Sequence, residues 1–286
     1  MQVIKWGLFE ISRENIRFTR VYGLNQNSKL LTEVLPFGSV PGQSIKCTIA
    51  DDMICFSYLR MNGQKGIGIT LAFDLEAIPD NVLGFLPEMM SVLESSPPEL
   101  APLDINPRKI APPASIQIKN FDSAIFSFIT GFPTVILGNE DEILELIFAM
   151  SASLPKKMRA RFWFVTQSTS LSENVNIIGM PFSTDILSEL SEARGKYTVV
   201  VLGDHVYGQF SSQLCKKMAF HAEKGQYEQI KDLLTDFYEL VRDSEELPSA
   251  LKFAHQHGLH LSDAQLALIM RARYFGKEVP EGLVER

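Results

Sequence analysis

Short apolar runs recur along the first part of the chain, and polar or glycine-bearing segments separate them. Runs of this length, rich in β-branched and aromatic residues, are typical of β-strands. The pattern predicts five strands, over residues 3–11, 16–24, 45–49, 53–58 and 66–73.

The segments between these runs predict how the strands connect. The Asn-Gly pair in the RMNG segment at 60–63 is a strong hairpin signal, and Asp51-Asp52 suits another turn. A short helix is expected over 28–34. Apolar residues at helical spacing after Pro79 predict an amphipathic helix that this proline opens. A sheet with helices on one face follows from this order.

Six prolines fall between residues 95 and 114, where the composition changes. Proline fixes the backbone and removes a hydrogen-bond donor, so the pattern predicts an extended linker over 97–115. A proline-rich ligand for a recognition domain is the alternative, but no PxxP match with basic flanks supports it.

The clearest pattern follows the linker, from 132 to 166. An apolar run, FPTVILG, predicts a buried strand, and Asn139 then offers an N-cap to a helix. Three acidic residues, 140–142, place negative charge in the first turn of that helix. A second strand is expected over 162–165. This is a strand–helix–strand unit of an α/β domain.

The rest of the chain adds strands and then helices. Strands are expected over 176–179 and in KYTVVVLG at 196–203, and 124–129 reads as either a strand or a short helix. Helices are expected over 185–194, 214–220, 228–241, 247–255 and 263–274. The prediction is therefore an α/β (α+β) chain with a sheet domain at 1–96, the linker at 97–115 and an α/β domain with a helical C-terminal part at 116–286.

Charge and cysteine usage narrow the function classes. The net charge is −7 and the pI about 5.4, which disfavours nucleic acid as the main partner. Cys47, Cys55 and Cys215 show no CxxC spacing, which favours a reducing compartment. We expect no signal peptide and no transmembrane segment, because no run approaches about 20 apolar residues. We expect a cytoplasmic protein.

Three kinds of chemical site can be considered. Gly138 and Gly203 end strands, but acidic residues follow both and no phosphate-binding motif is present, so turn glycines are preferred and no cofactor is expected. His255, His257 and His260 form a metal-like cluster that Gly258 interrupts, so solvated histidines are preferred to a metal-dependent enzyme. No nucleophile motif is present, and Cys47 and Cys55 read as core thiols.

Arg60 and Lys65 remain as candidates, in the loop RMNGQK before the strand GIGITLAF. An arginine on an exposed loop, free of internal carboxylate partners, can stabilise charge in a phosphoryl-transfer transition state. The acidic residues nearest to Arg60, Asp52 and Asp74, are distant along the chain. An ordinary solvated turn is the alternative interpretation.

The order of strands and helices in the first unit resembles a longin-like domain. The segment RMNGQKGIGITLAFD is similar to folliculin-type and nitrogen-permease-regulator-like proteins, in which a loop arginine precedes a central apolar strand. In the second unit, FPTVILGNEDEILELIFAMSASLPKKMRARFWFVT is similar to the strand, helix, LP and strand pattern of DENN-type domains. It also resembles segments of prokaryotic GTPase-associated proteins.

This resemblance implies a regulator or partner of a small Ras-like GTPase, with Arg60 as the supplied arginine and Lys65 as a partner-binding residue. A non-catalytic scaffold subunit of a multiprotein complex, or a homo-oligomer, is the alternative. The chain is short for a longin–DENN protein, and an active site of its own is not predicted.

Overall fold

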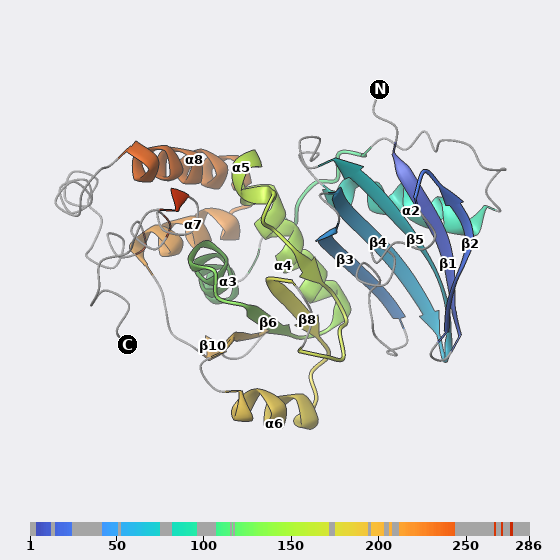
Figure 1. Cartoon of the computed structure of the whole chain (residues 1–286). Helices are drawn as coiled ribbons and strands as arrows, with labels where there is room; N and C mark the ends of the chain where they lie inside the picture. Colours follow the sequence, from blue (N-terminus) through green and yellow to red (C-terminus); the bar gives the residue numbers. More distant parts are fainter. Residues whose placement is uncertain are drawn as a thin grey trace. The chain divides into compact units, whose positions relative to one another are not determined.

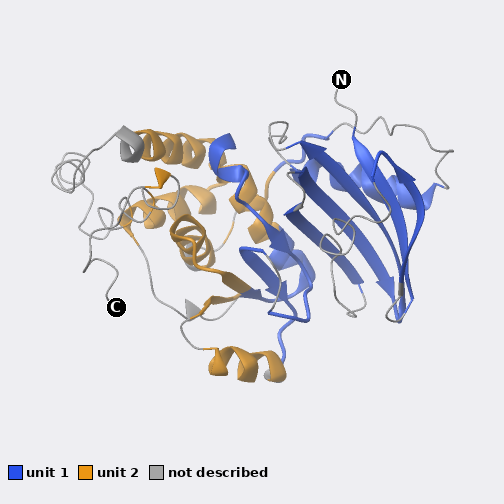
Figure 2. Cartoon of the chain, in the orientation of Figure 1, with its two compact units in different colours: residues 1–111, 136–144, 156–183 blue, residues 112–135, 145–155, 184–286 orange. Residues whose placement is uncertain are grey.

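The computed structural model describes residues 4–12, 15–24, 42–50, 53–74, 82–95, 107–114, 116, 118–171, 175–193, 196–202, 206–207, 212–243, 266, 270 and 275–276. The chain divides into two compact units (Figure 2). The first contains 1–111, 136–144 and 156–183, and the second contains 112–135, 145–155 and 184–286. Parts of the segment expected to form one C-terminal domain therefore belong to the first unit.

Five antiparallel strands form the N-terminal sheet of the first unit (Figure 1). They are β1 (Lys5–Ser12), β2 (Asn15–Tyr22), β3 (Gly42–Ala50), β4 (Met53–Asn62) and β5 (Lys65–Asp74), in the order β3-β4-β5-β1-β2. All five predicted strands are confirmed, but β4 continues to Asn62 rather than ending at Tyr58. The predicted hairpin is also confirmed, but its turn is Gly63-Gln64, with Gly63 at a φ of 62°, rather than the predicted residues 60–63.

A helix packs on one face of this sheet. The 3₁₀ helix η2 (Val82–Phe85) leads into α2 (Leu86–Glu94), which contacts β4 and β5. The rings of Phe73 and Phe85 lie 5.8 Å apart and join the sheet to the helix. The predicted amphipathic helix is thus confirmed from residue 82, whereas Pro79 and the short helix expected over 28–34 lie outside the described residues.

The strand–helix–strand unit is also confirmed. It comprises β6 (Thr134–Leu137), α4 (Glu140–Ser153), the short α5 (Lys156–Arg159) and β7 (Phe164–Val165). Strand β8 (Ile177–Met180) runs parallel to β7. In the described part of the first unit, β8 and β7 extend the N-terminal sheet, and the hydrogen-bonded order there is β8-β7-β3-β4-β5-β1-β2.

Strand β3 has partners on both sides. It pairs with β4 along its full length, and its other edge pairs antiparallel with β7 at Lys46 and Cys47. The Thr166 amide donates to the Ile45 carbonyl at 2.8 Å, and the Ile45 amide donates to the Thr166 hydroxyl at 2.9 Å. Ser44 also donates to the Thr166 carbonyl. This edge of the N-terminal sheet is therefore occupied within the first unit.

The second unit is mainly helical. Its elements are α3 (Ile118–Thr130), α6 (Thr184–Glu192), β9 (Thr198–Val201), β10 (Val206–Tyr207), α7 (Gln213–Glu223) and α8 (Tyr227–Asp243). The segment 124–129, for which a strand or a helix was open, is helical. Helix α3 packs on α7 and β9, and Ser127 donates to the Thr198 hydroxyl at 2.7 Å.

The later predicted helices have two outcomes. Those expected over 185–194, 214–220 and 228–241 are confirmed as α6, α7 and α8. The helix expected over 247–255 lies outside the described residues, as does most of the one expected over 263–274.

The part of the predicted linker that the structure describes, residues 107–114, carries neither helix nor strand, as expected. It is nevertheless held in place. Arg108 pairs with Glu88 at 2.6 Å in the first unit, and the Tyr227 hydroxyl donates to the Pro113 carbonyl at 2.8 Å in the second.

The three cysteines are buried, which confirms Cys47 and Cys55 as core thiols and places Cys215 in the core as well. Burial raises the pKa of the Cys47 thiol, so the reactive thiolate is disfavoured there. Of the helices within the described ranges, none combines the length and the apolar character needed to cross a membrane.

Candidate functional site

Arg60 lies near the end of β4, three residues before Gly63 of the hairpin turn. Its backbone is held on both sides, opposite Gln43 of β3 and Ile67 of β5. Its side chain is 43% exposed, and Nη1 lies 3.6 Å from Oε1 of Glu94, the last residue of α2. Arg60 therefore has a backbone that is fixed in the sheet and a guanidinium that faces solvent.

Lys65 is the first residue of β5 and is exposed. It pairs with Asn62, and residues two apart on a strand point to the same face of the sheet. Since Arg60 lies opposite Ile67, Lys65 is its diagonal neighbour on the same face. The structure thus brings the two predicted site residues together at one end of the hairpin.

Two details of the sequence prediction are wrong. Arg60 was expected on a loop, but the ladder to both neighbouring strands keeps it inside β4. It was also expected to be free of internal carboxylate partners, whereas Glu94 forms an ion pair with it. The helix after β5 returns across the sheet and ends beside Arg60, which separation along the chain did not reveal.

A polar network lies beside Arg60. The hydroxyl of Tyr58 donates to the side-chain Oε1 of Gln43 at 3.1 Å, and the backbone amide of Gln43 donates to Oε2 of Glu140 at 3.4 Å. Glu140 is half-buried at the start of α4. The network therefore connects the strand that carries Arg60 to the first turn of α4.

Burial shifts two titrating groups in this network. It raises the pKa of Tyr58, and the positive charge of Arg60 opposes that increase. Burial also raises the pKa of the Glu140 carboxyl, whereas the hydrogen bond from the Gln43 amide lowers it. Both groups bond to Gln43: the Tyr58 hydroxyl donates to its side-chain oxygen, and the Glu140 carboxylate accepts from its backbone amide.

The strand behind Arg60 is tightly packed. A Cβ on Gly68 of β5 would lie 2.3 Å from Phe9 Cζ and 2.6 Å from the Tyr58 carbonyl oxygen. Leu59 and Phe9 are almost completely buried. A ladder this closely packed holds the backbone of Arg60 rigidly.

Gly138 and Gly203 were considered as phosphate-binding turns, and only Gly138 lies within the described residues. Asn139, which follows Gly138, caps α4 by accepting from the Glu142 amide at 2.9 Å, as predicted, and three acidic residues occupy the first turn. That concentration of negative charge is unsuited to phosphate. Gly203 lies outside the described residues.

The histidine cluster His255, His257 and His260 also lies outside the described residues. Within the ranges that the structure describes, no group of histidine, cysteine and acidic side chains is arranged to hold a metal ion. His221 hydrogen-bonds through Nδ1 to Gln226 Oε1 at 2.9 Å, next to the end of α7.

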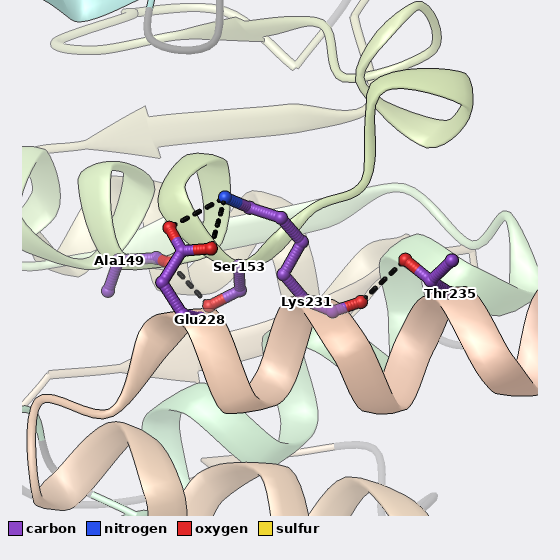
Figure 3. Close-up of polar contacts among 5 residues, drawn as sticks. All are labelled: Ala149, Ser153, Glu228, Lys231 and Thr235. Atoms are coloured by element: carbon purple, nitrogen blue, oxygen red, sulfur yellow. Dashed lines mark hydrogen bonds and ion pairs between the residues drawn. The ribbon is translucent and has the colours of Figure 1, made fainter.

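The polar contacts around α8 stabilise helices (Figure 3). Lys231 reaches back one turn to Glu228 at 2.7 Å, and Thr235 donates to the Lys231 carbonyl at 2.7 Å. In α4, Ser153 donates to the Ala149 carbonyl at 2.7 Å. These are short-range contacts within single helices, and they bring together no catalytic set of side chains.

The sequence pattern points to Arg60 and Lys65 but not to the residues around them, Gln43, Tyr58, Glu94 and Glu140. Their contacts join positions far apart in the chain, and no spacing motif predicts such a set. Comparison with protein-family models and with curated proteins finds no match for this chain.

Proposed function

We propose that this chain is a regulator or binding partner of a small Ras-like GTPase, and that Arg60 is the residue it presents to the bound nucleotide. The observation that carries the proposal is the placement of Arg60, with a solvent-facing guanidinium on a backbone fixed between two strands. An arginine supplied in this way neutralises charge on the transferred phosphoryl group.

The surroundings of Arg60 support the same role. Lys65 adds a second cation on the same face, beside the hairpin turn at Gly63. At Gly63, no atom of the described residues lies within 4 Å of the position that a Cβ atom would take, which leaves room for a partner at this end of the hairpin. The five antiparallel strands, followed by a helix, also agree with the element order on which the resemblance to longin-like domains rests.

The ion pair with Glu94 does not oppose this role strongly. Both side chains are substantially exposed, at 43% and 62%. Exposed pairs of this kind contribute about 0.2–1 kcal/mol, because water screens them and ordering two long side chains costs entropy. A phosphate group presented by a partner can replace the carboxylate at small cost.

A scaffold subunit could pair with other proteins through a sheet edge or through helices, and an exposed edge strand is a ready template for pairing. In the first unit, β7 occupies the β3 edge. Strand β2 is at the end of the strand order, but its register shifts opposite Leu8 and Phe9, and Arg17 and Arg20 are exposed along it. Bulges and exposed charges are devices that hinder edge pairing. An isolated complex whose activity tolerates Arg60→Ala would favour a scaffold role through another surface.

The test of the proposal is GTP hydrolysis and nucleotide exchange by the small GTPases of the host, with and without this protein. We expect one of them to bind the chain and hydrolyse GTP faster. Unchanged hydrolysis and exchange together with no binding, across all of those GTPases, would end the proposal.

A metal-dependent enzyme is tested separately. Protein purified without a histidine tag is expected to contain no stoichiometric metal by elemental analysis. Stoichiometric zinc or iron that is lost in a variant with alanine at His255, His257 and His260 would establish a metal site there.

A further inference from the structure

We infer that Glu94 is an internal counter-ion that occupies Arg60 in the free protein and competes with the partner's phosphate for it. The inference rests on the proposed function of Arg60 and adds a regulatory contact to that site. In this role Glu94 lowers the affinity of Arg60 for anions and contributes little to the stability of the fold.

The geometry of the Arg60–Glu94 pair indicates a contact that another anion can displace. The 3.6 Å separation between Arg60 Nη1 and Glu94 Oε1 is longer than a charge-assisted hydrogen bond, which is about 2.7–2.9 Å. Both side chains are solvent-exposed, so the carboxylate can leave without abandoning a buried charge. Glu94 also lies at the end of α2, next to Ser95 with its extended backbone.

A second cation favours the entering anion over Glu94. Lys65 lies diagonally across the hairpin from Arg60, on the same face. An oxyanion that replaces the Glu94 carboxylate at Arg60 therefore has a second cation on the same face of the sheet. A multiply charged phosphate interacts more strongly with this pair of cations than a single carboxylate does, because the Coulomb energy scales with the product of the charges.

The same helix provides a matched control. Glu88 lies in the first turn of α2 and pairs with Arg108 at 2.6 Å rather than with Arg60. Glu88→Gln removes the same charge from the same helix but leaves the Arg60 pair intact. A general change in electrostatic potential would act in both variants, whereas direct competition acts only in Glu94→Gln.

The experiment titrates inorganic pyrophosphate into the full chain and follows the Arg60 side-chain Nε–H resonance by NMR, with Arg60→Ala to assign it. We expect a saturable shift, and an affinity about two- to fivefold higher in Glu94→Gln, the range expected from an exposed ion pair. Glu88→Gln should match the wild type. Equal affinity in Glu94→Gln and wild type would overturn the inference, as would the absence of a saturable response in both.

The outcome separates this inference from the proposed function. Tighter pyrophosphate binding in Glu94→Gln, with no GTPase bound or stimulated, would support the counter-ion and refute the GTPase role. A stimulated GTPase together with equal pyrophosphate affinity in wild type and Glu94→Gln would support the GTPase role and refute the counter-ion.

Discussion

The position of Arg60 inside a strand lowers the entropy cost of ordering this residue when a partner binds. A residue on a free loop loses backbone freedom on binding, whereas the ladder to β3 and β5 has already fixed this one. In the proposed role, only the side-chain rotamers of Arg60 and its contact with Glu94 would have to change on binding. Preorganisation of this kind is what a group that stabilises a transition state requires.

The rigidity of that strand pair can be tested at Gly68. Gly68→Ala should lower the free energy of unfolding by about 1–3 kcal/mol, because the new methyl group would overlap the Phe9 ring and the Tyr58 carbonyl. Urea denaturation measures the change. The control is Gly63→Asn at the hairpin turn, where φ is +62° and the space is open, so asparagine should cost less than about 1 kcal/mol. Equal losses in both variants would contradict tight packing at Gly68.

Tyr227 offers a test by pH. Its hydroxyl donates to the Pro113 carbonyl, and burial followed by the charge of Glu145 raises its pKa to about 12. An unfolded tyrosine titrates near pH 10. Between these values the unfolded chain loses the proton first, so the contribution of Tyr227 is complete below about pH 10 and is lost as the pH rises towards 12.

The measurement compares wild type with Tyr227→Phe by urea denaturation at several pH values. At pH 8 the variant should be less stable by about 0.5–1.5 kcal/mol, because it lacks the hydrogen bond. That difference should shrink as the pH rises from about 10 to 12. A difference that stays constant over this interval would show that folding does not raise the pKa of this hydroxyl.

Among the elements, α4 depends on a cap that the sequence predicted. Asn139→Ala should cost about 1 kcal/mol of unfolding free energy, because the Glu142 amide loses its acceptor. Asn139→Asp keeps an acceptor at the same place and should cost less, although Glu140 and Asp141 follow it. Thermal denaturation of the two variants beside the wild type decides this, and an alanine variant as stable as the aspartate variant would contradict the cap.

The strands of the first sheet were predictable because their apolar runs are short and end at clear turn signals. The ends of the strands were less predictable, because the pairing of Arg60 with Gln43 and Ile67 extends β4 beyond its apolar run. The segment 124–129 was ambiguous because an apolar run of six residues fits either a strand or a buried helix, and its packing against α7 and β9 decides for the helix.

Some residues of the candidate site could be predicted from the sequence and others could not. Arg60 and Lys65 could be found because the Asn-Gly pair in the sequence marks the hairpin that carries them. Glu94 and Glu140 could not, because each reaches the site through the return of a helix across many residues of chain. Long-range contacts of this kind leave no periodic signal in a sequence.

At the scale of the molecule, each compact unit is made of several separate segments of the chain, whereas the sequence analysis expected each domain to be one continuous segment. Residues 136–144 and 156–183 belong to the first unit, and β3 joins this part of the chain to the N-terminal sheet through β7. The boundary near 111 falls inside the proline-rich segment. The candidate site of Arg60, Lys65, Glu94 and Glu140 thus lies entirely within the first unit.

The proposed role of Arg60 is tested most directly by single-turnover GTP hydrolysis. The assay mixes each purified Ras-like GTPase of the host with wild type, Arg60→Ala, Arg60→Lys or Glu88→Gln. We predict that wild type and Glu88→Gln accelerate hydrolysis by one GTPase, by about 10³- to 10⁵-fold if Arg60 acts as a full arginine finger.

Both Arg60 variants should remain folded and still bind that GTPase, but should lose the stimulation, because alanine has no charge and lysine lacks the forked donor geometry. Stimulation that survives Arg60→Ala, in a variant that circular dichroism and urea denaturation show to be folded, would contradict the proposed role.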